Sequence, residues 1–165
     1  MSLGTDTVVS REVDWLSASV PPLPDLLKSD LNDFTAPFDE ITGYWQKDTG
    51  NARAVWVTRA EIDLDPWSTG RVLSRHQMLL RVWWPWLGDG VQDQADLDVA
   101  LDVLLQKVAG PQFDKTHGGA FMSAAEVRSS GIGIRCRVSA PQALKQGAAI
   151  TADITYVVDD QELAL

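Results

Sequence analysis

The residues best suited to chemistry by type and spacing are Asp114, Thr116 and His117, which lie together in a glycine-rich stretch. A histidine can act as a general base, a carboxylate can orient its ring, and a hydroxyl can serve as a nucleophile. No nucleophile-elbow motif accompanies them, and no second acid is placed near the cluster. We therefore favour a loop that caps a helix or contacts a subunit over a hydrolase site, and we expect no catalytic residues and no enzyme.

Metal chemistry has even less support in the sequence. His76 falls on the apolar phase of a predicted strand, and no second histidine, cysteine or paired carboxylate stands at metal-ligand spacing from it. Cys136 is the single cysteine, which excludes a disulfide framework and a thiolate metal cluster. We expect His76 to be a hydrogen-bonded histidine of the core or an interface, with no metal and no cofactor.

A stripe of arginines is more informative. Six of them fall on one phase of three predicted strands, namely Arg53, Arg59, Arg75, Arg81, Arg135 and Arg137. Apolar residues share this phase, namely Val55, Val57, Leu79, Trp83 and Val157. Two interpretations stay open: a solvated face whose cross-strand partners include Glu61, Asp63 and Asp153, or a surface that binds an acidic surface of another copy or protein.

On the second interpretation the stripe is an interface, and the loop histidine and an N-terminal tryptophan extend it. The predicted contact residues are then Arg53, Val55, Val57, Arg59, Leu79, Arg81, Trp83, Arg135, Arg137, His117 and Trp15.

These residues must be positioned by an amphipathic helix and four strands. The helix, 93–110, begins at Asp93 as N-cap, ends at Gly110 and Pro111, and has one apolar face, made of Leu97, Ala100, Leu101, Leu104, Leu105 and Val108. Alternating patterns predict strands at 53–64, 74–84, 126–138 and 148–158. We predict an α+β fold: a four-stranded antiparallel sheet packed by this central helix and by a short N-terminal helix at 25–34.

The domain organisation follows from the same patterns. Residues 1–20 are polar and lack a sustained period, so we expect an N-terminal arm that is disordered or docks on a neighbour through Trp15, with disorder favoured. Residues 21–165 form a single domain, and 165 residues suffice for one substantial core. No stretch approaches the length of a membrane helix, and residues 1–10 have neither the basic nor the apolar region of a secretion signal, so we expect a soluble protein that is not secreted by an N-terminal signal.

Charge restricts the possible partners. With 14 basic and 23 acidic residues, the chain carries a formal charge of -9 and repels phosphate. Tight binding to nucleic acid is therefore not expected, although a duplex can slide past a like-charged wall. Seven tryptophans in this length are typical of a protein with contacts between chains.

The order short helix, two strands, amphipathic helix, two strands in an acidic chain resembles the tail terminator (tail completion) proteins of long-tailed, siphovirus-type bacteriophages, especially those of actinobacterial phages. Three stretches carry the resemblance: the tryptophan-rich strand 79–84, the aspartate-rich helix 96–108, and the loop 110–121 with Thr116-His117-Gly118-Gly119. The N-terminal arm has no counterpart in this pattern.

The resemblance implies a structural virion protein that is assembled in the host cytoplasm. It implies a homohexameric ring that caps the tail tube protein and joins the tail to a head-tail connector or stopper, with double-stranded DNA passing through the lumen without specific binding. Two alternatives remain beside it. One is another neck protein, and the other is a small-ligand-binding α+β protein with a pocket around Trp56, Met78 and Trp84.

Overall fold

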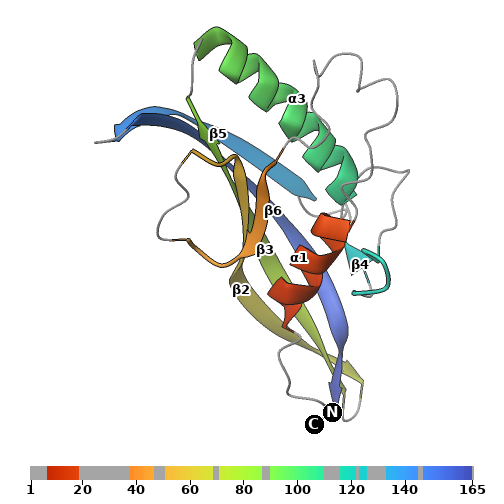
Figure 1. Cartoon of the computed structure of the whole chain (residues 1–165). Coiled ribbons are helices and arrows are strands. Elements are labelled where there is room, and N and C mark those ends of the chain that lie inside the picture. The colour runs from red at the N-terminus through yellow and green to blue at the C-terminus, as the bar shows by residue number, and fades with distance from the viewer. Residues whose placement is uncertain are drawn as a thin grey trace.

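The computed structural model of the chain describes residues 7–18, 38–46, 51–68, 71–86, 90–109, 116–121, 123–125, 133–144 and 147–164. The elements in order are α1 (Val8–Ala18), β1 (Glu40–Gly43), β2 (Ala54–Ser68), β3 (Arg71–Pro85), α3 (Gly90–Ala109), β4 (Ser123–Ala124), β5 (Ile134–Leu144) and β6 (Gly147–Ala164) (Figure 1). The helix predicted at 25–34 lies outside the described residues, as does Asp114.

The strands form one mixed sheet of six strands, in the order β1-β2-β3-β6-β4, with β5 also paired to β6. β1 runs parallel to β2, whereas the other pairs are antiparallel. The predicted four-stranded antiparallel sheet is therefore wrong. The long strands β2, β3, β5 and β6 overlap the predicted strands, although β5 continues to Leu144, past the predicted end at 138. Strands β1 and β4 have four and two residues, too few for a period of two to be recognised.

Both helices cover the same face of this sheet, which curls beneath them (Figure 1). The predicted apolar face of the central helix is confirmed, because Leu97, Ala100, Leu101, Leu104 and Val108 are buried in the core, and Leu105 packs against it partly buried. They pack with the apolar side chains of the sheet, among them Met78, Leu80, Trp84, Ile154 and Tyr156. We call this helix-covered side of the sheet the core face.

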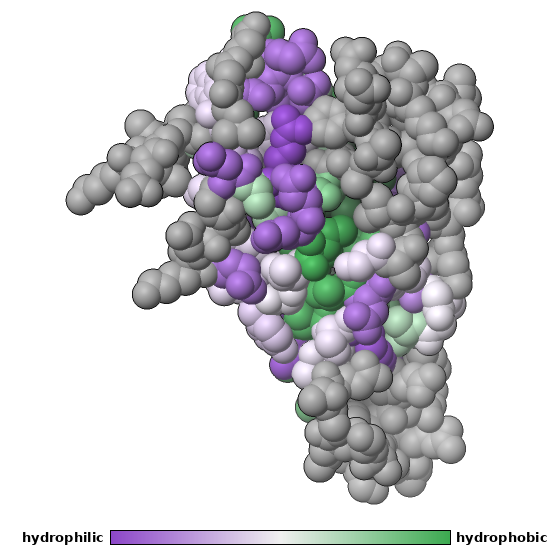
Figure 2. Space-filling view, in the orientation of Figure 1, coloured by the Kyte–Doolittle hydropathy of each residue, from purple (hydrophilic) through white to green (hydrophobic). Residues whose placement is uncertain are grey.

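Helix α1 departs from the expected irregular arm. Thr7 caps it, since the backbone N–H of Ser10 donates to Thr7 Oγ1 at 3.2 Å. Val8, Val9 and Leu16 are buried against the sheet. An apolar strip is visible where α1 lies on the sheet, between polar residues (Figure 2). The helical spacing was difficult to recognise because Glu12, a charged residue, occupies a position on the buried side.

The predicted phase of the first strand is also wrong. Val55 lies opposite Val82 and Val57 opposite Leu80, so both valines point to the core face, where they are fully buried. Trp56 consequently points to the other side of the sheet. The sequence could not decide this phase because residues 54–57 are apolar on both sides, and pairing with β3 fixes it instead. An irregularity between Arg59 and Glu61 then changes the alternation along β2.

Candidate functional site

The side of the sheet opposite α1 and α3, which we call the open face, brings together part of the predicted contact set. One row across the strands runs Trp56, Arg81, Asp153, Arg137, and the next runs Thr58, Leu79, Thr155, Arg135. Arg135 and Arg137 are exposed, while Leu79 and Trp83 are half-buried. Neither described helix covers these rows. Trp56 and Thr58 at the β2 end are buried, so the side chains of the contact-forming type that reach solvent are those of β3 and β5.

Arg81 is the best-ordered charge on the open face. Its Nε and Nη2 donate to the two carboxylate oxygens of Asp153 at 2.7 and 2.8 Å, and this hydrogen-bonded pairing raises the pKa of Arg81. The guanidinium also lies 4.5 Å from the ring centroid of Trp45. The pair is about one-third exposed, at 37% for Arg81 and 31% for Asp153, so it holds the arginine in place without removing it from solvent.

Three indoles form an aromatic group beside Arg81. Trp56 stacks on Trp83 with centroids 5.9 Å apart, and Trp45 meets Trp56 edge-on at the same distance. Trp45 is 50% exposed. It follows Tyr44, which adopts a left-handed φ of 67° and is fixed by its backbone N–H donating to the Val57 carbonyl at 2.8 Å. The group thus has a buried base and an exposed tip.

The predicted stripe of six arginines is split between the two sides of the sheet. Arg75, Arg81, Arg135 and Arg137 lie on the open face. Arg53 instead places its guanidinium 4.2 Å from the Trp84 ring centroid on the core face, and Arg59 lies opposite Met78. Val55 and Val57 are buried on that side as well. The wrong phase predicted for β2 explains why Arg53, Val55, Val57 and Arg59 were assigned to the wrong side of the sheet.

The same phase error removes the predicted ligand pocket. Met78 and Trp84 are fully buried on the core face, whereas Trp56 lies on the open face opposite Arg81. The three side chains predicted to line one cavity therefore lie on different sides of the sheet.

His117 is buried inside the subunit, and the half-buried Trp15 stacks on it, with ring centroids 3.7 Å apart and an interplanar angle of 5°. His117 Nδ1 is 2.9 Å from Glu12 Oε2, and Nε2 donates to the Val108 carbonyl at 3.1 Å, near the end of α3. The Tyr156 hydroxyl donates to the other oxygen of Glu12. The pKa of Tyr156 is raised well above its ordinary value, mainly because the side chain is buried and also because the Glu12 carboxylate lies beside it. The loop thus contacts the end of α3 through His117, which is buried within the subunit and does not lie at the predicted interface.

This buried cluster has the residue types of an active site, but its side chains are enclosed and not exposed to solvent. The side chains of Glu12 and His117 are 0% exposed, and Tyr156 is buried as well. The loop reaches this arrangement because His117 itself adopts a left-handed φ of 50° before Gly118 and Gly119. Glu12 and Tyr156 were not recognised from the sequence. The one signal was that Glu12 is a carboxylate at helical spacing from Val8, Val9 and Leu16. The cluster joins α1, α3, the 116–121 loop and β6.

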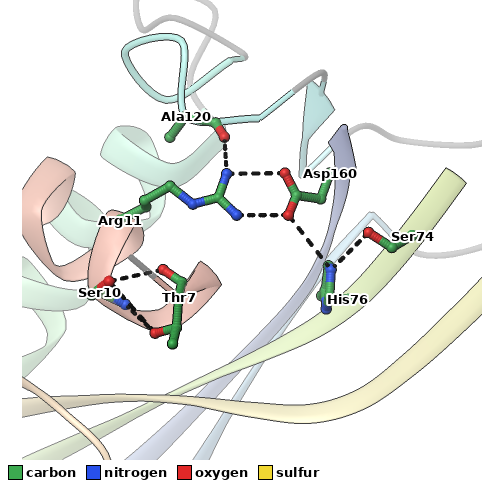
Figure 3. Close-up of polar contacts among 7 residues, drawn as sticks. All are labelled: Thr7, Ser10, Arg11, Ser74, His76, Ala120 and Asp160. Atoms are coloured by element: carbon green, nitrogen blue, oxygen red, sulfur yellow. Dashed lines mark hydrogen bonds and ion pairs between the residues drawn. The ribbon is translucent and has the colours of Figure 1, made fainter. Parts of the chain in front are cut away.

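A second cluster fastens α1 to β6 (Figure 3). Arg11 donates to both oxygens of Asp160 at 2.9 and 2.6 Å, and to the Ala120 carbonyl at 2.6 Å. His76 Nε2 lies 3.1 Å from Ser74 Oγ and 3.9 Å from Asp160, which confirms the expected hydrogen-bonded histidine. Burial lowers the pKa of His76, while the charge of Asp160 acts in the opposite direction.

Comparison with known proteins gives no family. No protein-family model matches the chain, and no curated protein matches it in sequence. Within the described residues, no group of three or more histidine, cysteine and carboxylate side chains could hold a metal ion. No helix of the described part is long and apolar enough to cross a membrane. The open face is therefore the feature of the described residues on which a functional argument can be built.

Proposed function

We propose that this chain is a structural virion subunit, a tail terminator whose copies form a ring that caps the tail tube and joins the tail to the head-neck complex. The observation that carries the proposal is the open face, where Trp45, Leu79 and Trp83 stand partly exposed among arginines. The pattern resemblance described above supports the specific role. The six-copy ring and its virion location belong to this proposal.

The composition of the open face favours a protein partner. Tryptophan and arginine are the residues most often found at the energetic centre of protein interfaces, because they bury a large area with few rotatable bonds. Arg81 is already held by Asp153 and Trp45, so docking on it immobilises little additional side chain. A surface of this kind suits a permanent assembly.

The charge of the chain favours a wall along which DNA passes. A formal charge of -9 repels the phosphate backbone, so a duplex inside a ring of such subunits is not retained by counterion release. The lumen would conduct DNA without binding it.

The test is whether the purified protein stops tail-tube growth. Tail tube protein is polymerised with and without the chain, and tube lengths and tube ends are examined by electron microscopy. We expect ring-shaped caps and shorter tubes, and a Trp45→Ser/Leu79→Ser variant that retains the wild-type melting temperature but no longer caps. Binding to connector or stopper rings but not to tubes would favour the alternative neck role. A monomer that binds neither component would contradict the proposal.

A further inference from the structure

The β5 side of the open face has a local charge opposite to that of the whole chain. In the two register rows that end at β5, three arginines, Arg81, Arg135 and Arg137, face one carboxylate, Asp153. Asp153 is already bonded to Arg81. Arg135 and Arg137 therefore make the β5 side of the open face basic, in a protein with a formal charge of -9.

The outward side of α3 is the acidic counterpart. Val91, Ala95, Asp98 and Asp102 are exposed and recur at helical spacing along one stripe, with Val91 76% exposed. The sequence of α3 contains one basic residue, Lys107, whose Nζ lies 4.5 Å from the Trp15 ring centroid. The stripe is thus rigid, negatively charged, and apolar at its beginning.

The two surfaces also match in spacing. Asp98 and Asp102 are four residues apart on a helix, or about 6 Å along its axis. Arg135 and Arg137 are two residues apart on a strand, or about 7 Å. Each arginine can therefore meet one carboxylate when α3 of one copy lies along β5 of another, and such a pairing can be bidentate at both positions.

The contact must be head-to-tail. The inward side of α3 packs on the core face, so its outward stripe and the open face are on opposite outer surfaces of the two-layer domain. Two different surfaces that bind each other give a heterologous interface, which closes into a ring when the rotation between copies allows it. An isologous dimer would need one self-complementary patch instead.

We propose that Arg135 and Arg137 on β5 of one subunit bind Asp98 and Asp102 on α3 of the next, and that this contact forms the ring. This inference rests on the proposed function, because it names the subunit contact of that assembly. Val91 and Ala95 of α3 add apolar area at the same interface, where Leu79 lies in the register row of Arg135.

Charge reversal in two separate chains tests the contact. Arg135→Glu/Arg137→Glu makes the β5 side acidic, and Asp98→Lys/Asp102→Lys makes the α3 stripe basic. Each variant alone brings like charges together and should weaken self-association by about 100-fold or more. Sedimentation over a range of protein concentrations measures this loss, and thermal melting close to that of the wild type confirms that each variant is folded.

An equal mixture of the two variants is the decisive sample. Alternating copies restore opposite charges at every contact, so the mixture should assemble as the wild type does. Glu61→Lys/Asp63→Lys makes the same charge change on β2, outside this contact, and on its own it should assemble as the wild type does.

Two results overturn this contact and leave the proposed function standing, provided that the wild type assembles. One is that the β5 variant also assembles, and the other is that the mixture of the two variants stays dissociated. A wild-type monomer that binds neither tail tubes nor neck components overturns both.

Discussion

The two faces of the sheet handle polar groups in opposite ways. On the core face, Glu12 and His117 are fully enclosed and meet partners from four elements. On the open face, Arg81 and Asp153 form an equally close pair that stays about one-third exposed. Close geometry alone therefore does not distinguish a stabilising contact from a binding one. The degree of burial does, because it sets the cost of leaving a charge unpaired.

The largest effect is expected from Leu101→Asp on the core face. Leu101 is buried between α3 and the sheet, and a carboxylate there loses its hydration without a partner. We expect a loss of more than about 4 kcal/mol of unfolding free energy, enough to prevent stable folding. Thermal melting by circular dichroism measures it, with Gln106→Asp on the exposed side of α3 as the control. Equal melting temperatures would show that the core face is assigned wrongly.

The next largest loss of stability is expected when the buried carboxylate of Glu12 is removed. Glu12→Ala leaves His117 and the Tyr156 hydroxyl without their shared acceptor, at a cost of about 3–5 kcal/mol for a broken buried pair. Urea unfolding gives the difference. Asp14→Ala, on the exposed side of the same helix, is the matched control and should change stability by less than about 0.5 kcal/mol. A small effect at Glu12 would mean that this cluster does not hold α1 to the domain.

The pH dependence of stability should report on His76. Burial lowers its pKa in the folded state, so the unfolded chain binds more protons as the pH falls below about 6.5. Stability should therefore decrease between neutral pH and about pH 5, by at most about 1.4 kcal/mol per pH unit for this one group. His76→Gln removes its contribution. Urea unfolding at several pH values tests this, and identical slopes for both proteins would show that His76 does not contribute.

The smallest effect on stability belongs to the open face. Arg81→Ala breaks a partly exposed pair and should cost no more than about 1 kcal/mol. Its effect on association should be much larger, because it removes the arginine that Trp45 and Asp153 hold in place. Parallel urea unfolding and sedimentation measure both quantities. A large loss of stability with unchanged association would reverse the roles assigned to the two faces.

Sequence patterns gave the parts of the fold that depend on local periodicity. The apolar face of α3 and the alternation of β3 and β6 were recognisable because each element has one buried side and one side turned toward solvent. The phase of β2 was not, since Val55 and Trp56 are equally apolar and only pairing with β3 distinguishes them. Helix α1 was hidden because its buried side contains Glu12, whose partners come from residues more than a hundred positions away.

The candidate site was predictable in part for the same reason. Leu79, Arg81, Trp83, Arg135 and Arg137 were placed together correctly because their strands alternate cleanly. Trp45 was missed, since it follows a four-residue strand and reaches the open face through the left-handed turn at Tyr44. His117 was wrongly predicted to lie at the interface because it is in a loop, whereas its contact with the buried Glu12 holds it inside the subunit.

Hydroxyl-radical footprinting of Trp45 and Leu79 tests the central claim most directly. The protein is oxidised as a dilute monomer and again when bound to tail tubes, and the modified fraction of each residue is read by mass spectrometry. We predict that assembly protects both residues while exposed Tyr44, on the other side of the turn from Trp45, serves as the internal comparison. Unchanged modification of Trp45 and Leu79 in an assembled particle would show that the open face is not where the partner binds.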